Sequence, residues 1–184
     1  LPTDKPYLKT SVFETFNSRI PWLLLLMVSA TFTGQIIAKF EDALGACAIL
    51  TAYIPMLMDT GGNCGSQSST LIIRGIALGE IRFSDLFRVM FKEFRVSLIV
   101  GVVLALANGL RILIMYRNAG LALVIGLSLV ATVIISKLIG CLLPLFAKKL
   151  HMDPAIMASP LITTLVDTCS ILIYFNIATR IFQL

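Results

Sequence analysis

Long apolar runs, separated by short polar connections, dominate the chain after residue 20. Each run is long enough for a helix to cross a membrane, which takes roughly 17–25 residues. The pattern predicts an all-α integral membrane protein with five transmembrane helices, which together form one domain over residues 21–184. The expected spans are residues 21–38, 43–78, 96–115, 119–146 and 154–182.

The second of these spans contains a polar segment that an ordinary membrane helix does not need. Across residues 43–73 the only charge is Asp59, which is followed by Gly61-Gly62-Asn63, then a third glycine and a glutamine. Irregular polar backbone is tolerated at membrane depth only inside the protein or along a water-filled cavity. We therefore expect the second helix to be broken at the Gly-Gly-Asn segment and to border an aqueous path.

Two segments outside the spans are amphipathic. Residues 1–20 combine charges with apolar residues at helical spacing, which indicates an N-terminal amphipathic or connecting segment. Residues 80–95 show the same combination and predict an amphipathic helix that lies at the membrane surface.

Composition supports a membrane protein and excludes other classes. Hydrophobic residues make up 58% of the 184 residues and charged residues only 14%, whereas soluble domains usually have about 25% charged residues. The net charge of +5 does not indicate nucleic-acid binding, because the basic residues are spread over the connections between apolar runs. The four cysteines lie within apolar runs and form no CxxC pair, so we interpret them as small buried residues.

The basic residues also predict an orientation, because Lys and Arg accumulate on the cytoplasmic side of a membrane. With five spans, ten of the 15 lie on the N-terminal side, four on the other side and Lys137 within the fourth span. We expect a multi-pass protein of the plasma membrane with a cytoplasmic N-terminus and an external C-terminus. The four on the external side are Lys39, Arg111, Arg117 and Arg180.

Only two acids lie well inside the apolar spans, Asp59 and Asp167. A charged side chain at membrane depth is costly, so both are functional candidates. Asp167 belongs to a stripe of polar residues spaced by four, four and three, which places them on one helix face. The stripe consists of Ser159, Thr163, Asp167 and Ser170. For its hydroxyl groups, an interhelical hydrogen-bond seam is the alternative interpretation.

Oxygen ligands without clustered His or Cys indicate a hard cation. Mg²⁺ is typically held by one or two carboxylates while it keeps several waters, which suits one aspartate from each of two chains. Ligand type alone leaves Ca²⁺ and Mn²⁺ open. We expect Lys137 to pair with Asp167 or Asp59 away from the ion path. The candidate metal ligands are Asp167, Thr163, Asn63, Ser159 and Asp59.

Two segments of the chain resemble the signatures of the MgtE family of magnesium channels. In the second span the matching residues are Pro55, Gly61-Gly62-Asn63, Gly65 and Gln67-Ser68. In the fifth span they are Asp153-Pro154-Ala155, Pro160-Leu161, Thr164-Leu165 and Asp167.

The resemblance implies five helices per protomer and a homodimer whose pore is lined mainly by the second and fifth helices. It implies that Asp167 binds Mg²⁺ in the pore and that Thr163 occupies the neighbouring position. Family members commonly carry cytosolic domains that sense Mg²⁺. We expect no such sensor within this chain, so residues 1–20 are either the end of a connecting helix or an independent amphipathic segment.

We therefore expect a homodimeric channel in the lipid bilayer that passes Mg²⁺ into the cell. Mg²⁺ is then both the transported ion and the ion bound in the pore. We do not expect an enzyme, since a two-aspartate protease would need both acids in one site. We expect passive flow and not pumping, because the chain contains no nucleotide-binding motif. The alternatives are a cation exchanger coupled to Na⁺ or H⁺ and a non-conducting scaffold.

Overall fold

The structure is a computed structural model of the chain that describes residues 5–157 and 159–184. Within these residues the chain forms helices and no strand, as expected for the all-α class. The long helices are α1 (Val12–Lys39), α3 (Ile49–Ala77), α4 (Leu86–Tyr116), α5 (Ala119–Lys149) and α6 (Ser159–Phe182). The short ones are η1 (Tyr7–Lys9), α2 (Glu41–Ala46), η2 (Phe83–Asp85) and η3 (Pro154–Met157).

Four helical segments are long and apolar enough to cross a membrane. They are Val12–Lys39, Phe83–Tyr116, Ala119–Lys149 and Pro160–Phe182. The prediction of a protein with several membrane-spanning helices is confirmed to that extent. The remaining long helix, α3, has 29 residues, or about 43 Å at 1.5 Å per residue, but it carries the polar motif. That α3 is a fifth span stays a prediction.

The expected break in the second span is wrong, because α3 runs without interruption from Ile49 to Ala77. The motif glycines allow close helix packing instead. A Cβ atom added to Gly61 would lie 2.6 Å from Val166 Cγ1 on α6. A Cβ atom added to Gly140 of α5 would collide with the backbone oxygen of Gly65. Small residues at such crossings let helix backbones approach each other, so here they serve packing rather than an interruption.

Helix α3 also continues through Pro55, near a point where α6 supports its backbone. Proline lacks an N–H and removes one bond from the helical ladder. Close by, the Tyr174 hydroxyl donates a hydrogen bond to the carbonyl oxygen of Leu50, at 2.6 Å. The two side chains are fully buried in the cluster that joins α3, α5 and α6, so the proline segment is held by the core.

Two helices begin earlier than the expected spans. Helix α1 starts at Val12 and passes through Pro21, so residues 12–20 are its first turns and not a separate surface helix. A capping box explains this start, since Ser11 Oγ accepts from the Glu14 backbone N–H and the Glu14 carboxylate accepts from that of Ser11. Helix α4 likewise takes in residues 86–95. The domain boundary at residue 20 stays a prediction.

The observed boundaries of the last two long helices differ from the expected ones near Pro144 and Pro154. Helix α5 passes through Pro144 and ends at Lys149, where we had expected an end at Phe146. The fifth span divides into η3 and α6 instead of forming one helix from Pro154. A proline inside a membrane helix is tolerated where neighbouring helices support the backbone.

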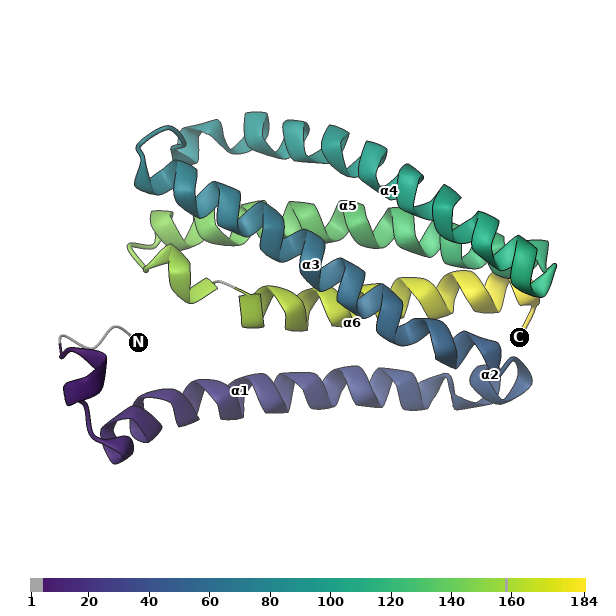
Figure 1. Cartoon of the computed structure of the whole chain (residues 1–184), viewed down its shortest axis with the longest axis horizontal. Helices are drawn as coiled ribbons and strands as arrows, with labels where there is room; N and C mark the ends of the chain where they lie inside the picture. Colours follow the sequence, from purple (N-terminus) through teal and green to yellow (C-terminus); the bar gives the residue numbers. More distant parts are fainter. Residues whose placement is uncertain (1–4, 158) are drawn as a thin grey trace.

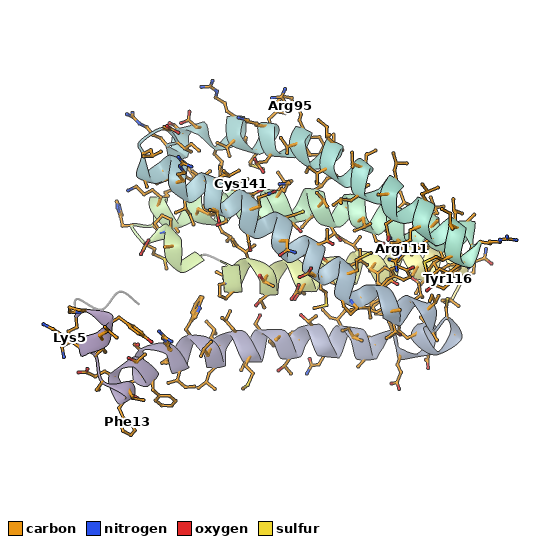
Figure 2. All side chains as sticks on the ribbon, viewed as in Figure 1. Lys5, Phe13, Arg95, Arg111, Tyr116 and Cys141 are labelled. Atoms are coloured by element: carbon orange, nitrogen blue, oxygen red, sulfur yellow. The ribbon has the colours of Figure 1, made fainter. Side chains whose placement is uncertain are left out.

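Helices α3, α4, α5 and α6 pack together, and α1 lies along the side of α6 (Figure 1). Helix α5 is central, since 44% of the residues in its most apolar 18-residue stretch are buried, against 6% for α1. The outer surface of α1 and α4 is therefore mostly apolar and exposed, as a lipid-facing surface must be. Figure 2 shows Lys5 and Phe13 at one end of the molecule, and Arg111 and Tyr116 at the other.

Candidate metal centre

The Gly-Gly-Asn motif of α3 lies against the polar stripe of α6. A Cβ atom on Gly62 would lie 3.3 Å from Thr163 Cγ2 and 3.6 Å from Thr163 Oγ1. The missing side chain therefore allows α6 to approach and brings the Thr163 hydroxyl next to the backbone of the motif. Two segments that are about 100 residues apart in the sequence form one polar contact.

Asp167 follows Thr163 by one helical turn on α6 and is half-buried. Its Oδ1 atom is buried and has no hydrogen-bond partner among the described residues. Asp167 also takes part in neither of the ion pairs found in that part of the chain, which are Lys5–Glu14 and Arg88–Asp85. A buried carboxylate oxygen without a partner is unfavourable, so its presence calls for a functional reason.

Asp59 and Asn63 lie on the exposed side of α3. They are one turn apart, and Asn63 Nδ2 donates a hydrogen bond to Asp59 Oδ2 at 3.2 Å. This bond orients the Asn63 amide and does not use its oxygen, so an amide oxygen and a carboxylate remain able to bind a hydrated cation.

The rest of the polar stripe points into the bundle. Ser170 is buried, and its Oγ atom has no partner within the described residues; the same holds for Thr132 Oγ1 on α5. Ser159 is the first residue of α6, but its side chain lies outside the described part of the structure. Among the candidate ligands, the structure thus places Thr163 against the backbone of the Gly-Gly-Asn motif. It also connects Asn63 to Asp59 by a hydrogen bond.

No group of three or more His, Cys, Asp or Glu side chains that could hold a metal occurs among the described residues. The donor set in this region is instead carboxylate, amide, hydroxyl and backbone oxygen. Such a set suits a hard cation that keeps most of its water.

The prediction that Lys137 pairs with Asp167 or Asp59 is wrong, since neither ion pair found among the described residues includes Lys137. Its ammonium donates to Gln67 Oε1 at 3.2 Å and to Ser68 Oγ at 3.4 Å, both on α3. The distances between helices that decide such a pairing cannot be obtained from spacing along one chain.

A contact between α1 and α6 was not predicted. The hydroxyl oxygens of Thr33 and Thr168 lie 3.0 Å apart and share a hydrogen bond, and Thr33 is buried. Thr168 directly follows Asp167, so α1 is attached to α6 beside the candidate ligand. The signal available in the sequence was the presence of hydroxyl residues in an otherwise apolar span.

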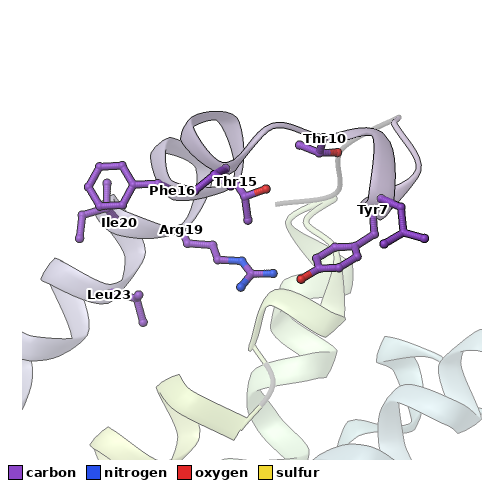
Figure 3. A pocket seen from close by; sticks show the side chains of 9 residues that line it. Tyr7, Thr10, Thr15, Phe16, Arg19, Ile20 and Leu23 are labelled. Carbon is purple, nitrogen blue, oxygen red and sulfur yellow. The ribbon is translucent and has the colours of Figure 1, made fainter.

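One open hollow lies apart from the candidate ligands, between η1 and the first turns of α1 (Figure 3). Arg19 and Tyr7 extend into it from opposite sides. Its other lining residues are Leu8, Thr10, Val12, Thr15, Phe16, Ile20 and Leu23.

Comparison with known proteins identifies a family for this arrangement. The family model of MgtE, described as a divalent cation transporter, matches residues 54–177. This range includes α3 from just before Pro55, all of α4 and α5, and α6 up to Ile177. Both segments that carry the candidate ligands therefore lie within the match.

Three proteins named magnesium transporter MgtE are similar to the chain. The one from Bacillus subtilis (strain 168) is 40% identical over 170 residues, which are 92% of this chain and 38% of that protein. The one from Thermus thermophilus is 35% identical over 182 residues, 98% of this chain and 40% of that protein. The one from Enterococcus faecalis is 33% identical over 163 residues, 89% and 36% respectively. The chain thus spans about two fifths of the length of these relatives.

Proposed function

Because the chain belongs to the MgtE family of divalent cation transporters, we propose that it forms a channel for Mg²⁺ with its pore at a homodimer interface. The observation that carries the proposal is Asp167, whose Oδ1 atom is buried without a hydrogen-bond partner among the described residues. A cation beside this carboxylate would offset the cost of burying it. The similarity to proteins named magnesium transporters supports Mg²⁺ as the ion.

The exposed polar side of α3 supports the homodimer. Asp59 and Asn63 are exposed in the single chain, yet polar groups at membrane depth do not face lipid. A second copy placed against α3 and α6 would cover this side and present a second Asp167. Two carboxylates and several retained waters are a typical environment for Mg²⁺.

In the proposed mechanism, Asp167 attracts the ion, while oxygen atoms of Thr163, Ser159 and Asn63 orient the water molecules bound to it. Asp59 strengthens the attraction through its charge and its bond to Asn63. The N-terminus lies in the cytoplasm in this proposal, and an inside-negative potential makes entry of the cation favourable. The gain is about 2.3 kcal/mol per charge for each 100 mV, and therefore about 4.6 kcal/mol for a divalent ion.

The test is Mg²⁺ influx into liposomes that contain the purified protein, under an imposed inside-negative potential. Asp167→Ala is expected to lower influx at least about 100-fold, because it removes the proposed binding carboxylate. Asp42→Ala is the matched control, since Asp42 is an exposed acid on α2 and its loss should leave influx unchanged. Unchanged influx in Asp167→Ala would refute the proposed site.

The same liposomes separate a channel from an exchanger. In a channel, influx follows the membrane potential and the Mg²⁺ gradient and is unaffected by an imposed Na⁺ or pH gradient. Influx that follows a Na⁺ or pH gradient at constant potential would instead establish the exchanger.

A further inference from the structure

Lys137 is a charged side chain enclosed in the middle of the bundle. It is only 3% exposed and stands 12 residues before the end of α5 at Lys149, a distance of about 18 Å at 1.5 Å per residue. Its four-carbon stem cannot extend that far to reach the headgroup region, as lysines near helix ends do. The charge must therefore be stabilised inside the protein.

A chain of hydrogen bonds across three helices provides that stabilisation. The Lys137 ammonium on α5 donates to Ser68 Oγ on α3 at 3.4 Å. The Ser68 hydroxyl in turn donates to Glu93 Oε2 on α4 at 2.6 Å. Each group thus donates toward the carboxylate, so a positive and a negative charge are joined through one buried hydroxyl.

The close approach of α3 and α5 brings this network to the exposed side of α3. Gly65 and Gly140 meet backbone to backbone, and a Cβ atom on Gly65 would lie 3.2 Å from the Ser136 carbonyl oxygen. Lys137 follows Ser136, so its side chain starts almost in contact with α3. From there its ammonium also reaches Gln67 Oε1, at 3.2 Å.

Gln67 belongs to the same exposed row as two candidate ligands. Asp59, Asn63 and Gln67 are spaced by four residues, which places them on one side of α3, and all three are exposed. The ammonium of Lys137 therefore lies directly behind the polar row to which we assign the ion path. An uncompensated positive charge there would repel a divalent cation twice as strongly as a monovalent one.

We propose that Lys137 and Glu93 form a compensated charge pair, joined through Ser68, that anchors Gln67 and keeps net positive charge away from the polar row of α3. The proposal rests on the proposed function for its effect on Mg²⁺. Glu93 thereby acts on ion passage from α4, a helix to which no candidate ligand belongs.

The test is a double-mutant cycle of Glu93→Gln and Lys137→Met in the liposome assay. Glu93→Gln keeps the shape and an acceptor for Ser68 but leaves the lysine uncompensated, so Mg²⁺ influx should fall about tenfold. Adding Lys137→Met removes the lysine charge, and influx should return to within about threefold of the wild type. Glu80→Gln, at an exposed acid in the connection after α3, is the matched control and should behave as the wild type.

Influx in Glu93→Gln equal to that of the wild type would overturn the proposal, and so would a double variant no better than Glu93→Gln. Thermal unfolding of the same proteins in detergent gives a second reading that does not need transport. Glu93→Gln should have the lowest midpoint temperature of unfolding, and the double variant a higher one. Changes in midpoint temperature that simply add in the double variant would overturn the charge pair. Absence of wild-type influx would refute the proposed function and leave this second reading to decide the network.

If Glu93→Gln does not fold, Gln67→Glu provides the alternative variant. It places a carboxylate within reach of the Lys137 ammonium and should raise influx at low Mg²⁺ concentration about threefold. Equal or lower influx would contradict the proposal.

Discussion

Lys137 and Asp167 are ionisable side chains of the helical bundle, and their surroundings are opposite. Lys137 is almost fully buried and donates hydrogen bonds to Gln67 and Ser68. Asp167 is half-buried, and its Oδ1 atom has no partner in the part of the chain that the structure describes. Stability accounts for the first arrangement, because a buried charge with partners is tolerated. The second costs stability, which is typical of a residue that binds something else.

The packing around the two residues differs as well. Near Lys137, α3 and α5 touch through the backbones of Gly65 and Gly140, which leaves no room for a further atom. Near Asp167, the glycines of α3 face side chains of α6 instead, since a Cβ atom on Gly61 would lie 2.6 Å from Val166 Cγ1 and one on Gly62 would lie 3.3 Å from Thr163 Cγ2. A close-packed seam of backbone against backbone therefore lies beside the compensated charge, whereas backbone meets side chains beside the uncompensated one.

The largest change in stability is expected at the close-packed seam. Gly140→Ala would place a methyl group on the Gly65 carbonyl and force the backbones apart, which should lower the free energy of unfolding by about 3 kcal/mol. Gly34→Ala on α1 is the matched control, since a Cβ atom there meets nothing within 4 Å. It should be neutral or slightly stabilising. Chemical unfolding in detergent measures both, and equal values would show that the seam is not tight.

A change of opposite sign in the free energy of unfolding is expected at Asp167. Asp167→Asn removes a buried charge but keeps the side-chain shape, so it should raise the free energy of unfolding by about 1 kcal/mol while influx is lost. The same unfolding assay detects the gain. A loss of stability in Asp167→Asn would mean that the carboxylate has a structural partner and would remove the contrast with Lys137.

The smallest effect is expected where α1 meets α6. Thr33→Val keeps the side-chain shape and deletes the hydrogen bond to Thr168, which should cost about 0.6 kcal/mol, a typical value for such bonds in membranes. Because Thr168 adjoins Asp167, influx should also change, by no more than about threefold. Thr31→Val is the matched control, since the Thr31 hydroxyl donates within its own helix, to the Met27 carbonyl. A tenfold loss of influx in Thr33→Val would show that α1 positions the site.

The sequence predicted the helical class and the α3 and α6 segments that carry the candidate ligands, but not the role of the glycines. Gly61 and Gly62 both weaken a helix and permit close packing. The neighbours Val166 and Thr163, more than 100 residues away, decide between these roles. Ser11 and Glu14 form the capping box that starts α1, but the apolar run from which the first span is predicted begins only at Pro21.

The partners of Lys137 could not be predicted for a related reason. Periodicity places a residue on a face of its own helix, but it does not say which helix packs against that face. Asp59 and Asp167 are acids within long apolar runs, which makes them candidates from the sequence alone. Glu93 belongs to a segment whose pattern predicts a surface helix. In the structure that segment is the first part of α4, and Glu93 bonds to Ser68.

The most direct test of the central claim is recording of ion currents across a bilayer with Mg²⁺ as the only permeant cation. The wild type should carry an inward Mg²⁺ current at inside-negative potential. Asp167→Ala should carry almost none, and Asp42→Ala should match the wild type. Equal Mg²⁺ currents in the wild type and Asp167→Ala would contradict the assignment of Asp167 as the binding carboxylate of the pore.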